Sequence, residues 1–92
     1  MAKFLMLGKY SLEAVKGIAP ERTKKVVETI EKAGGKVHSM YALLGCQDLA
    51  MVVDFSSNSE AIKASLTITK LTGIGFNTSP AVSIEEFDKI VG

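Results

Sequence analysis

The residue of this sequence best suited to proton transfer is His38. It is the only histidine in the chain, and imidazole is the side-chain group that titrates nearest neutral pH. As a general base or a haem ligand, His38 would need to face a cleft beside an orienting carboxylate such as Asp54. The strand pairing derived below instead turns His38 toward the helices or places it near the edge of its strand. We therefore expect a structural or surface role for this histidine.

Other polar residues near His38 are candidates for ligand binding. Tyr41, Ser39 and Asp54 could together bind a polar group in a cleft, although a hydrogen-bonded interface role for Tyr41 is the favoured alternative. Asp48 begins a strand, and we expect its carboxylate to cap the preceding turn rather than to act in catalysis. Cys46 lies at the same turn without the base or helix N-terminus that activates a thiol. The full set of ligand-binding candidates is Tyr41, Ser39, Asp54, Asp48 and His38.

No cofactor or metal is expected. The sequence contains no Walker loop, dinucleotide fingerprint or cluster of metal ligands. One cysteine and one histidine cannot form a structural zinc site within one chain. Arg22, Lys24 and Lys25 could bind a phosphate, but basic residues in the first turns of a helix usually form a solvated face. These observations leave open whether the chain is an enzyme.

Hydrophobic patterning predicts the elements that would position these residues. The predicted strands cover residues 3–7, 36–44, 49–55 and 74–82. A helical pattern that follows Ser11 is interrupted at Gly17, and the main first helix runs from Pro20 to the glycine pair 34–35. A second helix begins at a capping box at Ser57 and ends at Gly73, and a tail helix follows a second capping box at Ser83. Gly75 weakens the last strand and Pro80 breaks it, so we place this strand at a sheet edge.

This order of elements predicts an α+β fold of the ferredoxin-like type. The βαββαβ arrangement forms a four-stranded antiparallel sheet with two helices on one face. We assign residues 1–92 to a single domain, because a chain of 92 residues has no room for a second core. If Leu44 opposes Gln47 across a two-residue turn, Met40 opposes Met51 and His38 opposes Val53. The helix-covered face then contains His38, Met40, Ala42, Leu49, Met51 and Val53, and the opposite face contains Val37, Ser39, Tyr41, Leu43, Ala50, Val52 and Asp54.

The face without helices also requires a cover. Ala50 and Val52 make it apolar, whereas a solvated antiparallel sheet face should be polar. A second copy of the same sheet, packed face to face about a two-fold axis, is the simplest cover, and we expect a homodimer. The alternative is that the tail folds across the open face through Phe87 and Ile90.

Composition restricts the partners and the compartment. A net charge of +1 argues against a nucleic-acid partner. The single cysteine is typical of a reducing compartment. The apolar run from Phe4 to Leu7 is shorter than a signal peptide requires, and no segment is long enough to span a membrane. We expect a cytoplasmic protein that contacts no membrane.

Several short motifs together resemble the GYD-domain family, which comprises short bacterial and archaeal proteins. The motifs are Gly8-Lys9-Tyr10-Ser11, Ala19-Pro20-Glu21-Arg22, Gly34-Gly35-Lys36-Val37, Tyr41, Leu44-Gly45-Cys46-Gln47-Asp48 and Gly73. The family is named for a Gly-x-Tyr-Asp-like stretch between the second and third strands. Gly45 and Asp48 match that stretch, but Gln47 stands where the family usually has tyrosine, so a role of that tyrosine does not carry over.

The resemblance implies a dimeric α+β barrel, in which two ferredoxin-like subunits pack sheet to sheet around a central cleft. Relatives with this architecture include metal-free monooxygenases, haem-degrading enzymes and ligand-sensing modules of transcription regulators, and the GYD family itself has no settled activity. We therefore expect a homodimer, or a larger oligomer of dimers, that binds a small organic ligand in the cleft. The alternative is a non-catalytic oligomerisation or ligand-sensing module. A cavity with convergent polar groups would favour the first reading, and a dry contact the second.

Overall fold

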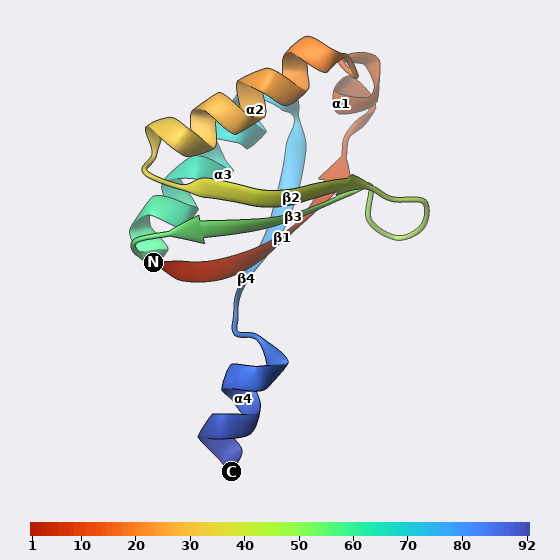
Figure 1. Ribbon diagram of the computed structural model, residues 1–92. Helices are drawn as coiled ribbons and strands as arrows, with labels where there is room; N and C mark the ends of the chain where they lie inside the picture. The colour runs from red at the N-terminus through yellow and green to blue at the C-terminus, as the bar shows by residue number, and fades with distance from the viewer.

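Four strands and four helices form the chain, and the computed structural model describes residues 1–92 (Figure 1). In order, the elements are β1 (Ala2–Tyr10), α1 (Leu12–Lys16), α2 (Pro20–Lys32), β2 (Lys36–Ala42), β3 (Leu49–Phe55), α3 (Asn58–Thr72), β4 (Ile74–Ala81) and α4 (Ile84–Val91). The strand order in the sheet is β2-β3-β1-β4, and every neighbouring pair is antiparallel. The predicted ferredoxin-like α+β topology is confirmed.

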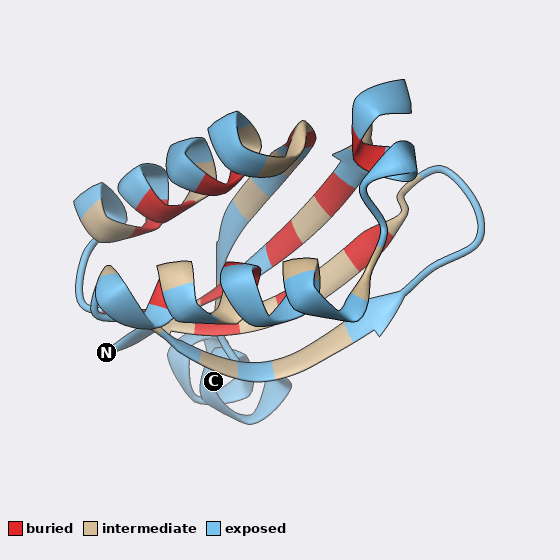
Figure 2. Ribbon diagram, turned by 90° about the horizontal axis from the view of Figure 1, so that it is seen from above, coloured by how far each residue is buried: buried red, intermediate tan, exposed pale blue.

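Helices α2 and α3 lie over one face of the sheet, and the core fills the space between the two layers (Figures 1 and 2). Phe4 and Phe55 meet there edge to face, with 5.7 Å between their ring centroids. The largest fully buried side chains are those of Phe55, Met6, Ile30, Met51, Ile68, Ile74 and Val53. Ile30 and Ile68 come from α2 and α3, and the other five come from the strands. Since side chains alternate between the faces of a strand, these five define the covered face of the sheet.

The helices begin and end at the capping residues that the sequence predicts. Pro20 is the first residue of α2, and α3 ends at Gly73, whose φ of +79° is readily adopted only by glycine. The N-cap Ser57 accepts a hydrogen bond from the backbone N–H of Glu60 at 3.3 Å. The carboxylate of Glu60 in turn accepts from the backbone N–H of Ser56 at 3.0 Å, one residue before the cap. The predicted capping box therefore forms, except that Glu60 binds the backbone N–H of Ser56 and not that of the N-cap Ser57.

The hairpin between β2 and β3 keeps the predicted register but has a longer loop. β2 ends at Ala42 rather than Leu44, so the loop covers residues 43–48. Ala42 pairs with Leu49 and Met40 with Met51, as predicted. The backbone N–H of Leu43 donates to the carbonyl of Asp48 at 2.9 Å and closes the loop.

A β-bulge at His38 changes the register in the first half of β2. Ser39 pairs with Val52 and Val37 with Val53, so His38 is an extra residue without a partner on β3. The predicted pairing of His38 with Val53 is therefore wrong. Val37, and not His38, packs against the core.

Strand β4 forms one edge of the sheet, as predicted, because it pairs only with β1. The interruption predicted near Pro80 is absent, and the strand continues to Ala81. Pro80 is tolerated in it because an edge strand does not require every backbone N–H for pairing.

The last helix, α4, projects from the end of β4 on the side of the sheet opposite α2 and α3 (Figure 1). None of its residues is buried. The alternative in which Phe87 and Ile90 cover the open face of their own chain is therefore wrong. No helix of the chain has the length and hydropathy needed to cross a membrane.

Candidate functional site

The face of the sheet turned away from α2 and α3, called the open face below, consists of three rows of residues that pair across the strands. The first row is Lys36, Asp54, Lys3 and Ala81, the second is Ser39, Val52, Leu5 and Ser79, and the third is Tyr41, Ala50, Leu7 and Asn77. The centre of this face is apolar, and no segment of the chain covers it. Leu5 is 37% exposed, and Leu7, Ala50 and Val52 are partly buried by their neighbours. Polar residues surround this apolar centre.

His38 and Asp54 form a direct pair at the first row. The Nε2 of His38 lies 2.5 Å from Oδ2 of Asp54, so the N–H donates to the carboxylate. The bulge carries the histidine to this position, since Val37 has taken its place on the covered face. The expectation that His38 turns toward the helices is therefore wrong, whereas the carboxylate considered as its orienting partner, Asp54, is the one that it contacts.

Charge at this position stabilises the Asp54 carboxylate. The hydrogen bond from His38 holds the pKa of Asp54 below its usual value. The positive charges of His38 and Lys3 lower this pKa further, against the opposing effect of partial burial. Lys3 Nζ lies 3.7 Å from Oδ1 of the same carboxylate. Because His38 binds Asp54 through Nε2, its Nδ1 remains available to a ligand.

Tyr41 and Ser39 also lie on the open face, but they do not meet Asp54. Tyr41 is 63% exposed in the third row. Its partner on β3, Ala50, is four residues from Asp54, which corresponds to about 13 Å along a strand at about 3.3 Å per residue. Ser39 lies between them, in the second row. One chain therefore places the three candidates along a face and does not bring them to one point.

Asp48 lies outside this face and connects the hairpin loop to β1. Its Oδ2 accepts a hydrogen bond from the backbone N–H of Tyr10 at 2.7 Å, and Lys9 Nζ lies 3.8 Å from the same oxygen. The backbone N–H of Asp48 donates to the carbonyl of Gly8 at 2.8 Å. The carboxylate thus binds the end of another strand, rather than its own turn as expected.

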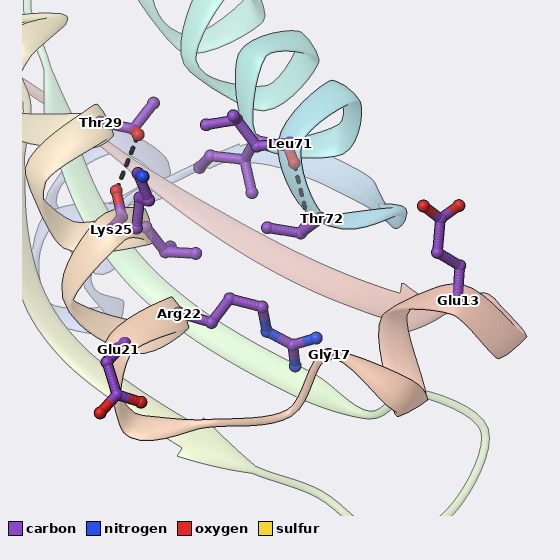
Figure 3. Close-up of a pocket in the computed structure, with 10 residues that line it drawn as sticks. Glu13, Gly17, Glu21, Arg22, Lys25, Thr29, Leu71 and Thr72 are labelled. Atoms are coloured by element: carbon purple, nitrogen blue, oxygen red, sulfur yellow. Dashed lines mark hydrogen bonds between the residues drawn. The ribbon is translucent and has the colours of Figure 1, made fainter.

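A separate candidate site, called the second recess below, is a hollow on the helical side of the molecule. It lies between the α1–α2 segment and the C-terminal part of α3 (Figure 3). It has a volume of about 380 Å³. Arg22 crosses it and donates to the backbone carbonyl of Ala14, with its guanidinium carbon 5.1 Å from the centre of the Tyr10 ring. Glu13, Glu21 and Lys25 also line the recess.

These contacts favour a structural role for the second recess. Arg22 connects α2 to α1 and to the end of β1 in place of a ligand, and the two glutamates would oppose an anion. The phosphate alternative for Arg22 and Lys25 thus gains no support from the structure. The open face remains the stronger candidate, since it combines an uncovered apolar surface with a polarised His–Asp pair.

Metal binding and thiol chemistry are the remaining possibilities. No group of three or more histidine, cysteine or acidic side chains is arranged to hold a metal ion. Cys46 is a free, exposed thiol in the hairpin loop.

Comparison with known proteins places the chain in a family. A family model described as the GYD domain matches residues 4–91. The chain belongs to the GYD domain family. A search of curated proteins found no significant match.

The signature segment of this GYD domain lies in the loop between β2 and β3. Gly45 has a φ of +147°, in a region that other residues rarely adopt. Asp48, the last signature residue, makes the contacts to β1 described above. Gly45 and Asp48 therefore have a structural explanation in the chain itself, and Gln47 stands between them in this loop.

One solved structure similar to this GYD domain is that of the leucine response regulatory protein LrpA of Mycobacterium tuberculosis. The TM-score is 0.59 at 12% sequence identity, and the match covers 89% of this chain. The chain matches only 51% of LrpA, about half of its length. At this level of identity the likeness concerns the fold alone.

Two features of this GYD domain have no signal in its sequence. The bulge that brings His38 to Asp54 has no signal in the residue pattern, because Val37 and His38 exchange faces without changing the composition of the strand. The contacts of Arg22 with Ala14 and Tyr10 depend on how α1 packs on β1, and the spacing of the residues does not reveal this packing.

Proposed function

We propose that this GYD domain is a homodimeric binding module that holds a small organic ligand between two open faces. The observation that carries the proposal is the uncovered apolar centre of the open face with the His38–Asp54 pair at its edge. An exposed apolar patch with a polar rim is typical of an interaction site. Face-to-face packing of two such sheets, about 10 Å apart, would cover the patch in both subunits.

The side chains of this face define the class of ligand. Leu5 and Val52 favour an apolar body, and the His38–Asp54 pair with Lys3 favours a polar or charged group at one end. With its Nε2–H donated to Asp54, His38 leaves its Nδ1 to a polar group of the ligand. A small molecule with an apolar body and a hydroxyl, amine or carboxylate group satisfies both requirements.

A sensing role is the form of this proposal that the comparison with LrpA supports. LrpA is described as a leucine response regulatory protein, and it shares the fold of this chain over about half of its own length. Leucine itself combines a branched apolar body with two charged groups, so it is the first compound to test. The second candidate is a module that only assembles; the separation of Tyr41 from Asp54 favours it, because the polar side chains of one chain do not converge.

The test is an NMR titration of the wild-type chain with L-leucine and with p-cresol, which combines an apolar ring with a hydroxyl group. Each compound is added up to about 10 mM, a range that detects weak binding. We expect shifts of the backbone amides of Leu5 and Val52, and affinity at least tenfold weaker in Asp54→Asn. Asp88→Asn, on the exposed α4, is the matched control and should bind like the wild type. A dimer in which no amide on the open face responds to either compound would contradict ligand binding and support the second candidate.

A further inference from the structure

Helix α4 carries an apolar side that its own chain leaves uncovered. Ile84, Phe87, Ile90 and Val91 have the spacing of one helix face, and they are 73%, 49%, 69% and 66% exposed. Acidic residues and a lysine occupy the rest of the helix: Glu85, Glu86, Asp88 and Lys89. The helix is therefore amphipathic, and its apolar side faces solvent in the isolated chain.

A helix as short as α4 is not stable in water unless it packs on another surface. α4 has 8 residues, whereas isolated helices shorter than about 12–15 residues are marginal in water. The hydroxyl of the N-cap Ser83 accepts one hydrogen bond from the backbone N–H of Glu86 at 3.1 Å. Such a cap adds about 1 kcal/mol of helix stability. A stable α4 requires a surface on which to pack.

The chain is less compact than a monomer of its mass. The chain exposes 6125 Å², whereas a compact monomer of this mass exposes about 5,200 Å². The excess of about 900 Å² is close to the area of about 800 Å² that each partner buries in a standard protein–protein interface. The radius of gyration of 13.6 Å likewise exceeds the value of about 12.3 Å for a compact chain of this length.

The position of α4 points to the side on which a second copy would lie. β4 ends opposite Lys3, in the row that also contains Asp54, and α4 continues from there away from α2 and α3 (Figure 1). Eight helical residues span about 12 Å, and two facing sheets lie about 10 Å apart. α4 is therefore long enough to reach the sheet of a partner packed on the open face.

We propose that α4 is an arm that packs its apolar side on a second copy of the chain and closes the end of the intersubunit cleft beside His38 and Asp54. This inference rests on the proposed homodimer and adds the element that completes its site. A two-fold axis makes the contact reciprocal, so each subunit both supplies an arm and receives one. The net charge of −2 on α4, from three carboxylates and one lysine, opposes the alternative of packing on an anionic membrane.

The test measures hydrogen exchange of the α4 amides at several protein concentrations, with the oligomeric state followed by sedimentation. Amides from Phe87 onward donate the hydrogen bonds of this helix, the first of them to Ser83 at 2.9 Å. We expect exchange at least tenfold slower at concentrations where the chain is dimeric than after dilution to the monomer. Phe87→Asp should remove this protection and weaken dimerisation at least tenfold. Asp88→Asn, on the same helix, should change neither.

Each other outcome overturns the inference. A dimer whose α4 amides exchange rapidly would show that the arm is free, while leaving the sheet-to-sheet dimer of the proposed function intact. Protection that persists in the diluted monomer would show that α4 packs on its own chain. A chain that is monomeric at all concentrations would overturn both proposals. Phe87→Asp retains its fold in each case, since no residue of α4 is part of the core, and circular dichroism checks this.

Discussion

Two aspartates from the same set of candidates have different surroundings in the structure. Asp54 lies on the open face, bonded to His38 and near Lys3. Asp48 lies at the end of the hairpin loop and binds the backbone of β1. Asp48 accepts a backbone N–H and holds the loop on β1, whereas Asp54 contacts only side chains on the open face. The proposed ligand site therefore includes Asp54 and not Asp48.

The pH dependence of stability should identify the contribution of Asp54. Its pKa is lower in the folded chain than in the unfolded chain, so the carboxylate stabilises the fold above the unfolded value near 3.8 and ceases to do so as the pH falls through the folded value. We expect Asp54→Asn to lower the free energy of unfolding by about 0.5–1 kcal/mol at pH 6, the range of partly exposed ion pairs. The difference from the wild type should be smaller at pH 2 than at pH 6, because the carboxylate becomes protonated as the pH falls. Urea unfolding at both pH values measures it, and a difference that grows on acidification would contradict the assignment.

Replacing Asp48 should affect stability without affecting the open face. Asp48→Ala removes the acceptor of the Tyr10 amide, and we expect a loss of about 1–2 kcal/mol in the free energy of unfolding. Asp48→Asn retains an acceptor oxygen and should lose less. Hydrogen exchange at the Tyr10 amide reports the same contact directly, and it should quicken in the alanine variant. Unchanged exchange at Tyr10 would show that another group holds the loop.

Among the elements, β2 shows how one extra residue changes a site. Val37 pairs with Val53 and Ser39 with Val52, so the strand on either side of His38 already has a complete ladder. The bulge interrupts that ladder and places an imidazole on the open face. The bulge brings a histidine to a carboxylate, and the pairs on either side of it are complete without His38.

Deletion of His38 should therefore be tolerated by the fold. The pairs Val37–Val53 and Ser39–Val52 would become consecutive in the ladder. We expect the free energy of unfolding to change by less than about 1 kcal/mol. Deletion of Met40, whose side chain packs against the core, should instead cost about 2–3 kcal/mol. Chemical unfolding of both variants measures the contrast. Equal destabilisation would mean that the bulge itself supports the sheet.

The same strand shows what the sequence can and cannot reveal. Helix bounds, the edge position of β4 and the pairing of Met40 with Met51 follow from local signals: caps, glycines, a proline and the alternation of apolar residues. The face of His38 does not, because alternation assumes two residues per repeat and a bulge breaks that repeat without a marker in the sequence. The sequence therefore indicates Asp54 as the carboxylate that could orient His38, and the two are in contact, but it predicts the wrong face for the histidine.

For the whole molecule, the uncovered surfaces are the feature that needs explanation. The open face and α4 leave apolar side chains exposed on the same side of the sheet. The sequence indicates the open face through the apolar residues Ala50 and Val52, which a solvated strand would replace with polar ones. It gives no direction for α4, because the path of a helix after a two-residue linker depends on what it packs against.

A charge at the centre of the open face should separate folding from assembly. Leu5 lies in the middle row and is 37% exposed, so Leu5→Asp places a carboxylate in water in the monomer and in the sheet-to-sheet contact in the proposed dimer. An unpaired buried charge is strongly unfavourable, and we expect the dimer to weaken at least a hundredfold, about 2.7 kcal/mol, with little change in the unfolding of the monomer. Ser79→Asp in the same row but on the edge strand is the control, and it should weaken the dimer much less. If sedimentation finds Leu5→Asp as dimeric as the wild type, the two chains do not meet through the centre of this face, where Leu5 lies.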